Sequence, residues 1–232
     1  MRPAKTGIHQ GLAYALWLPE GRQPPPAAGV LTLHGAGSRK ENHFDFARAV
    51  IASGLAAMTF DQRGHGDSEG SLDARAIDDV VAMADLLRQE LGSDDPPVAL
   101  RGSSMGGYLA LAAASPSRAA AVVAICPASA DGLRRGLRDG SFDFAADVDQ
   151  LSAMLDGADL HDVVPRLTIP VLLLHAQGDE RVPVQHSREL AAELQAPTSR
   201  LIEVPGGHHQ SIQHDDELQA VSVRFILRAL GM

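Results

Sequence analysis

The chain has 232 residues, of which 45% are hydrophobic and 21% are charged, and its formal net charge is −9. This length and composition allow one large domain or two small ones with a sizeable core, and they argue against disorder. The acidic balance, without a basic stripe, argues against binding to the phosphate backbone of a nucleic acid.

The single cysteine, Cys126, excludes an internal disulfide and favours a reducing compartment. Residues 1–10 are polar and lack the apolar segment of a signal peptide. No apolar run approaches the ~20 residues that a membrane span needs. We therefore expect a cytoplasmic protein with no membrane segment.

The chain alternates apolar segments typical of buried strands with segments of helical periodicity. Strands are expected at 12–18, 29–34, 55–60, 98–100, 121–125, 171–175 and 200–204. Helices are expected at 44–53, 73–91, 108–114, 131–137, 144–155, 184–194 and 215–230. Pro24, Pro25 and Pro26 indicate a stiff loop between the first two strands. The alternation predicts an α/β fold, a mostly parallel sheet with helices on both faces, as a single domain over 1–232.

The strand at 98–100 is followed by the pattern Gly-x-Ser-x-Gly, formed by Gly102, Ser104 and Gly106. Strand, sharp turn and helix are the context in which this pattern is a nucleophile elbow. Ser104 would then be the nucleophile, and the backbone N–H of Met105 would point at an oxyanion. On its own, the pattern also fits an ordinary Gly/Ser-rich turn before a helix.

Other polar clusters also follow predicted strands, at the edge of a parallel sheet where binding sites collect. They begin at His34, Asp61, Asp179 and His208.

A serine hydroxyl needs a base within hydrogen-bond reach, and the base needs an orienting carboxylate. Asp179 follows the strand at 171–175, and Glu180 beside it is a competing candidate. The base candidates, His208 and His209, follow the last strand. The chain order is Ser, Asp, His, as expected for this elbow.

A second oxyanion donor is expected where the strand at 29–34 ends. Gly35 and Gly37 allow a sharp turn there, which would aim the backbone N–H of Ala36 at the same point as that of Met105. The loss of one such donor typically costs roughly 3 kcal/mol of transition-state stabilisation.

The chain resembles the α/β-hydrolases of the serine esterase, lipase and peptidase type, from about Val30 to the closing helix. The resemblance is carried by residues 34–37, 61–70, 102–107, 178–183 and 205–209. Within the superfamily the chain is most similar to small cytosolic carboxylesterases such as the feruloyl/cinnamoyl esterases. The resemblance implies Asp179 as the acid and His209 as the base, because the base loop commonly reads Pro-Gly-small-x-His.

Similar enzymes insert a cap over the site where this chain has residues 127–167. Five apolar residues of this segment either line an acyl or aromatic pocket or pack the cap onto the sheet: Phe142, Phe144, Leu151, Met154 and Leu155. The insertion is short, which argues against a deep tunnel for long acyl chains.

Several other polar residues are interpreted as structural. The charges of Asp61, Arg63, His65 and Asp67 are expected to pair and hold the floor of the site, and His34 to orient its loop. Five histidines have no metal-ligand spacing and are interpreted as surface or packed residues: His43, His161, His175, His186 and His214. Cys126 is interpreted as a small buried residue.

We therefore predict a serine hydrolase of small to medium carboxylic esters that requires no cofactor or metal. Ser104, Asp179 and His209 form its triad, the Ala36 and Met105 N–H groups form its oxyanion hole, and activity falls on the acid side as His209 protonates. A small-molecule ester is its expected partner. The alternatives are an aminopeptidase-like cleavage of amides, and a ligand-binding hydrolase homologue without turnover.

Overall fold

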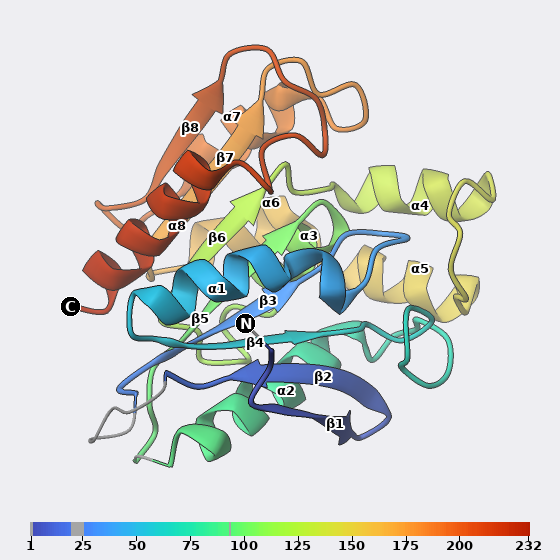
Figure 1. The fold of residues 1–232 in the computed structure, drawn as a ribbon. Coiled ribbons are helices and arrows are strands. Elements are labelled where there is room, and N and C mark those ends of the chain that lie inside the picture. The colour runs from blue at the N-terminus through green and yellow to red at the C-terminus, as the bar shows by residue number, and fades with distance from the viewer. Residues whose placement is uncertain (1, 20–25, 93) are drawn as a thin grey trace.

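The computed structural model describes residues 2–19, 26–92 and 94–232; Pro24 and Pro25 of the predicted stiff loop lie outside them. One eight-stranded sheet runs through the molecule in the order β1-β2-β4-β3-β5-β6-β7-β8 (Figure 1). The strands are β1 (Lys5–His9), β2 (Leu12–Trp17), β3 (Gly29–Leu33), β4 (Ala56–Phe60), β5 (Val98–Ser103), β6 (Ala121–Ile125), β7 (Val171–Ala176) and β8 (Arg200–Val204).

The sheet is antiparallel only at its N-terminal edge, where β2 pairs antiparallel with both β1 and β4. All other pairs, from β4 to β8, are parallel. Every residue of β2 to β7 is buried, as expected for strands covered on both faces, whereas the edge strands β1 and β8 are partly exposed.

Helices cover both faces of the sheet. They are α1 (Phe44–Ala52), α2 (Ala76–Leu91), α3 (Met105–Ala112), α4 (Ala130–Arg138), α5 (Val148–Gly157), α6 (Leu160–Val163), α7 (Val184–Glu193) and α8 (Asp216–Ala229), with 3₁₀ turns at Lys40–His43 and Val164–Arg166. α1 and α8 lie together on one face, in front of the sheet in Figure 1. Their residues form one apolar cluster with the sheet, and residues of α2, α3 and α7 form the other.

Residues 127–167 contain α4, α5 and α6, and α4 and α5 pack against each other at the right of Figure 1. A short parallel bridge between Leu72 and Ala146 joins this segment to the loop after β4. The backbone N–H of Leu72 donates to the carbonyl of Ala145 (2.9 Å), and the N–H of Asp147 donates to the carbonyl of Leu72 (2.9 Å). These contacts fix the segment beside the carboxyl ends of the strands.

The predicted sheet with helices on both faces is confirmed, and several elements differ from the prediction. β5 ends at Ser103 and not at residue 100, α3 begins at Met105 and not at Tyr108, and α6 was not predicted. β1 was not predicted, because an exposed edge strand lacks the apolar residues that mark a buried one. α5 begins at Val148 and not at Phe144, because the bridge holds the preceding residues extended and Asp147 caps the helix. α2 begins at Ala76 and not at Asp73, whose carboxylate accepts from the N–H of Arg75.

Candidate active site

Ser104 occupies a sharp turn between β5 and α3, with φ 55° and ψ −118°. Its N–H donates to the carbonyl of Ile125 (2.9 Å), and its own carbonyl accepts from the N–H groups of Tyr108 (3.0 Å) and Ala128 (3.0 Å). A non-glycine residue with positive φ is uncommon and persists only where its surroundings hold it in place. Contacts to β6, α3 and the segment after β6 therefore hold the Ser104 backbone in a strained conformation.

The two glycines of the motif allow this turn. A Cβ atom on Gly102 would lie 2.0 Å from the carbonyl oxygen of Gly106, and a Cβ on Gly106 would lie 2.4 Å from that of Leu33. The strand, the helix and the neighbouring strand thus approach at distances that no side chain would permit.

Asp179 and His209 come together from the loops after β7 and β8. The Nδ1 atom of His209 lies 2.7 Å from the Oδ2 atom of Asp179. The other carboxylate oxygen accepts from the backbone N–H groups of Arg181 (2.8 Å) and Val182 (2.9 Å). This is the arrangement in which a carboxylate fixes the orientation of an imidazole.

The Asp179 side chain is fully buried. Burial acts to raise its pKa, but hydrogen bonds from His175, His209 and the Val182 N–H outweigh that effect and hold the pKa of Asp179 well below its ordinary range. The carboxylate is therefore ionised at neutral pH.

His175, near the end of β7, contacts the loop that carries Asp179. Its ring is fully buried; Nδ1 lies 2.7 Å from the Ser187 hydroxyl, and Nε2 lies 2.9 Å from the Val182 carbonyl and 3.5 Å from the Asp179 carboxylate. His175 was predicted to be a surface or packed residue; it is packed, and it also approaches Asp179. Its place at the end of an apolar strand, four residues before Asp179, was the available signal.

Of the two candidate bases, His209 is buried and His208 is exposed. The N–H of His208 donates to the Ser211 hydroxyl (2.9 Å), which in turn donates to the His208 carbonyl (2.8 Å). Gly206 and Gly207 both have positive φ (66° and 72°), so the loop turns where no other residue would turn freely. His209 is the histidine that lies against Asp179.

Ser104 and His209 line the same pocket, which has a volume of about 1100 Å³. Gly35 and Ala36 line it as well, and a Cβ on Gly35 would lie 3.3 Å from that of Ser104. Within residues 2–19, 26–92 and 94–232, no hydrogen bond joins the Ser104 hydroxyl to His209. Such bonds are often long in ligand-free enzymes and shorten when substrate binds. Met105 begins α3, so its N–H has no partner within the helix.

The loop that carries Ala36 is held by imidazoles. The backbone N–H of Gln62 donates to Nε2 of His34 (3.0 Å), so Nδ1 carries the proton and donates to the Gly35 carbonyl (2.8 Å). Burial lowers the pKa of His34 to about 4, which keeps it neutral and able to accept. The Gly37 N–H donates to Nε2 of His65 (3.2 Å) in the same way.

A charged bridge joins the same two loops. The Lys40 ammonium donates to carboxylate oxygens of Asp61 (2.7 Å) and Asp67 (2.6 Å), and the Lys40 N–H donates to the other Asp61 oxygen (2.7 Å). Arg63 forms a second buried pair with Asp79. The charges of the loop after β4 therefore pair, as expected.

Arg101 is a buried cation in β5 that was not predicted as a site residue; a charge directly after the predicted apolar strand at 98–100 was the available signal. Its guanidinium lies 3.8 Å from the centre of the Phe46 ring and donates to the carbonyl of Gln213 (2.8 Å). Burial lowers the pKa of Arg101 to about 10, so it remains charged at neutral pH. It ties the loop that carries His209 to β5, the strand that leads into the Ser104 turn.

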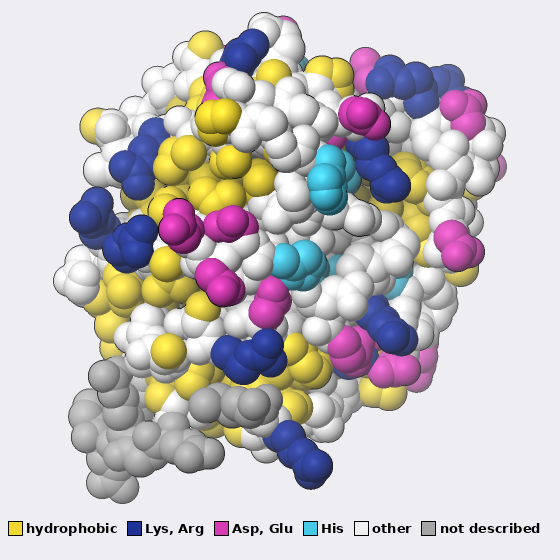
Figure 2. Space-filling model, turned by 45° about the horizontal axis from the view of Figure 1, so that its top comes forward, with side chains coloured by type: hydrophobic (Ala, Val, Ile, Leu, Met, Phe, Trp, Pro, Cys, Tyr) yellow, Lys and Arg dark blue, Asp and Glu magenta, His cyan; other side chains and the backbone are white. Residues whose placement is uncertain are grey.

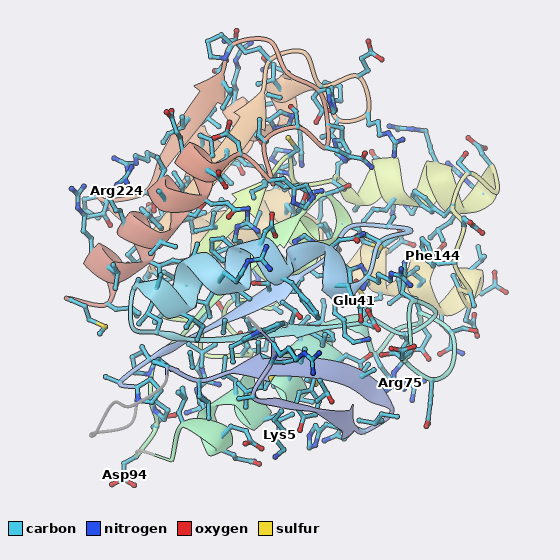
Figure 3. All side chains as sticks on the ribbon, in the orientation of Figure 1. Lys5, Glu41, Arg75, Asp94, Phe144 and Arg224 are labelled. Carbon is cyan, nitrogen blue, oxygen red and sulfur yellow. The ribbon has the colours of Figure 1, made fainter. Side chains whose placement is uncertain are left out.

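The five apolar residues singled out between 127 and 167 mostly pack this segment onto the core. They line a small apolar cavity of about 10 Å³ beneath α4 and α5, and Phe142 alone among them also lines the large pocket. Figure 3 shows Phe144 between α4 and α5 at the same end of the molecule as Glu41. The rings of Phe142 and Phe144 stack 5.3 Å apart.

The rim of the large pocket carries charges of both signs, with acidic residues in excess. Its lining includes Asp131, Asp143, Asp159, Glu189, Arg135 and Arg181. In Figure 2, histidine side chains lie in the middle of the visible face with acidic side chains beside them.

Among the residues that the structure describes, no helix is both long and apolar enough for a membrane crossing.

Two family models match the chain. One, described as serine aminopeptidase S33, matches residues 24–139, which are half of the chain, and one described as TAP-like protein matches residues 156–229. The uncharacterized protein YfhR of Escherichia coli O157:H7 is 27% identical over 215 residues, covering 88% of this chain and 72% of that protein. Monoglyceride lipase of Homo sapiens is 35% identical over 118 residues, covering 48% of this chain and 37% of that protein.

Among solved structures, Est1E of Butyrivibrio proteoclasticus with ferulic acid bound has a TM-score of 0.76 and 20% identity, covering 99% of this chain and 100% of that one. The likeness confirms the α/β-hydrolase fold that the sequence predicts. The chain belongs to the α/β-hydrolase family described as serine aminopeptidase S33.

Proposed function

We propose that this hydrolase cleaves carboxylic esters of small to medium size through an acyl-enzyme. The observation that carries the proposal is the 2.7 Å contact between Asp179 and His209 in a pocket that also exposes the strained Ser104. A binding protein would gain nothing from a serine held at positive φ, whereas a nucleophile gains an exposed hydroxyl.

In the proposed mechanism, the Ser104 hydroxyl attacks the ester carbonyl and His209 accepts its proton. Asp179 holds the imidazole in one tautomer and stabilises the imidazolium. The backbone N–H groups of Ala36 and Met105 donate to the oxyanion. His209 then protonates the leaving alcohol and activates the water that hydrolyses the acyl-enzyme.

The size of the pocket and the nature of the relatives support an ester of modest size. A volume of about 1100 Å³ is slightly larger than that of ordinary small-molecule sites, so the pocket has room for an ester of small to medium size. Monoglyceride lipase is named for an ester substrate, and Est1E binds an aromatic carboxylic acid in its structure. An acyl group of short to medium length, aliphatic or aromatic, is the class that we propose.

Hydrolysis of p-nitrophenyl esters from acetate to palmitate, by the wild type and Ser104→Ala, tests the proposal. We expect turnover to peak at short chains and kcat to fall by about 10⁴-fold or more in the variant. Circular dichroism establishes that both proteins are folded. Absence of turnover with every ester, together with no labelling of Ser104 by a fluorophosphonate probe, would refute a serine hydrolase.

Amide cleavage is the second candidate, favoured by the acidic excess around the pocket and by the aminopeptidase description of the family. Carboxylates at the rim would attract the ammonium group of an aminoacyl substrate. Aminoacyl p-nitroanilides assayed beside the esters separate the two. A kcat/KM higher for the anilides than for every ester would assign the site to amides.

A further inference from the structure

A second cluster of side chains lies at the large pocket, apart from Ser104 and His209. It consists of His161 on α6 and His186 and Glu189 on α7, all of which line the pocket. One ligand atom from each residue lies within 4.8 Å of those of the other two. The spacing of these residues along the chain does not predict the cluster, because His161 belongs to a different element from the other two residues.

The local geometry leaves imidazole nitrogens available. Nδ1 of His161 lies 3.0 and 3.1 Å from the two carboxylate oxygens of Glu193, so its Nε2 atom is left for another partner. Nε2 of His186 is buried and has no hydrogen-bond partner among the described residues. A histidine that binds a metal usually donates its other ring N–H to a carboxylate, as His161 does here to Glu193.

The surrounding charge favours a cation. The carboxylates of Glu193, Asp159 and Glu189 all act on His161 electrostatically. Among the described residues, Glu189 has one competing contact: its Oε1 atom accepts from the Gln185 side chain at 3.2 Å, and its second oxygen remains available. His186 and Glu189 are three residues apart on α7 and therefore lie on one face of that helix.

We propose that His161, His186 and Glu189 bind one divalent transition-metal ion, of which Zn²⁺ fits best, with Glu193 orienting His161. Two imidazoles and a carboxylate suit Zn²⁺ and disfavour Mg²⁺ or Ca²⁺, which prefer oxygen ligands. Four-coordinate zinc places its ligand atoms about 3.3 Å apart, so the side chains close inward by roughly 1 Å when the ion binds. Water fills the fourth position.

The ion joins two parts of the fold. α6 belongs to the segment 127–167, whereas α7 follows the loop of Asp179. A bound ion thus links that segment to the core at the rim of the pocket and stabilises the folded chain in proportion to its concentration. This inference does not depend on ester hydrolysis, and its readout is metal binding.

Titration of the full chain with Co²⁺, after removal of any histidine tag and treatment with a chelator, tests the site. We expect one Co²⁺ per chain with visible d–d absorption, displaced by Zn²⁺, and a melting temperature raised by Zn²⁺. His186→Ala and the isosteric Glu189→Gln are expected to weaken binding by at least about 30-fold, and Glu193→Gln by about 10-fold. His9→Ala, on the distant edge strand β1, is the matched control and should bind as the wild type does.

Equal Co²⁺ affinity in the wild type, His186→Ala and Glu189→Gln would overturn the proposal. So would an equal loss in His9→Ala, or a wild-type dissociation constant weaker than about 0.1 mM, which would indicate adsorption to scattered histidines. Melting curves without metal show whether each variant is folded. If His186→Ala is not folded, the Co²⁺ affinity of Glu189→Gln still tests the site.

Discussion

The backbone of Ser104 has φ 55° and ψ −118°, a conformation that glycine adopts freely and that costs other residues about 1–3 kcal/mol. Both the N–H and the carbonyl of Ser104 form hydrogen bonds with neighbouring segments, so the surrounding fold holds the residue in this unfavourable conformation. Stability and catalysis are therefore expected to oppose each other at this one position.

Replacement of Ser104 by glycine should raise the free energy of unfolding by about 1 kcal/mol, because it removes the Cβ atom that makes positive φ unfavourable. That gain corresponds to a melting temperature higher by about 2–4 °C. Ser104→Ala keeps the Cβ and is the control; it should lose activity without this gain. Equal melting temperatures for the two variants would show that the turn is not strained.

The pKa of Asp179 lies below its ordinary value of 3.8, so its ionised form contributes stability above that pH, and the contribution is lost as the pH falls through the lower, folded-state pKa. Asp179→Asn should therefore lower the free energy of unfolding at pH 5, and the difference from the wild type should shrink toward pH 2. Urea unfolding at both pH values measures it. In the ester assay, the same variant should reduce kcat by about 10⁴-fold, because the imidazole loses its orienting carboxylate. A deficit in unfolding free energy that stays constant with pH would contradict the low pKa.

The sequence predicts residues such as Ser104 and Asp179 because local patterns carry them: glycines at fixed offsets and a polar loop after an apolar strand. His175 and Arg101 are not marked by such a local pattern. Their partners, the Val182 and Gln213 carbonyls, are backbone groups, which leave no trace in the residue type. Residues that act by holding a loop in place can therefore be recognised only from the contacts in the three-dimensional structure.

At the scale of the elements, the turn around Ser104 depends on close contact between β5 and α3. A Cβ on Gly102 would lie 2.0 Å from the Gly106 carbonyl oxygen and 2.7 Å from the Gly107 nitrogen. Both atoms belong to the backbone, so no side-chain rotation relieves the overlap. The helix would have to move away from the strand.

Gly102→Ala should therefore lower the free energy of unfolding by about 3 kcal/mol or more and reduce activity at the same time. Gly157→Ala, at the end of α5, is the matched control, because a Cβ there meets nothing within 4 Å. That variant should be neutral or up to about 1 kcal/mol more stable, since alanine favours a helix. Chemical denaturation of both proteins provides the comparison; a stable Gly102→Ala protein would contradict the close packing.

The elements that the sequence predicts well are the buried ones, β2 to β7, because burial on both faces demands continuous apolar runs. β1 and the start of α5 are fixed instead by pairing with distant segments: β1 by its ladder to β2, and residues 145–147 by Leu72. Long-range pairing of this kind has no local sequence signature, and so these boundaries were wrong or missing.

For the whole molecule, the pocket arises where loops from β3, β5, β7 and β8 meet the segment 127–167. Phe142 and Leu133 each line both the large pocket and the small apolar cavity. The alternation of strands and helices predicts that such loops gather at one edge. It does not predict which side chains line both the large pocket and the small cavity, or that His161 contacts α7. Those contacts depend on how α4 to α7 pack.

Phe142→Ala should join the small cavity to the large pocket and shift the preferred p-nitrophenyl ester toward longer acyl chains. The expected change in the ratio of kcat/KM for decanoate to that for butyrate is about tenfold, the value of one or two buried methylene groups. Phe144→Ala removes a ring from the small cavity alone and should leave the ratio unchanged. A ratio that shifts equally in both variants would mean that the segment had loosened as a whole.

β8 is an edge strand whose five residues are all exposed or partly exposed, yet the loop that follows it carries His209. The Ser104 turn, in contrast, follows β5, a strand that is buried throughout and paired on both sides. Opening of exposed edges requires less free energy than global unfolding. We therefore expect heat to inactivate the protein by reversible fraying of this edge, so that activity disappears a few degrees before the helical signal does.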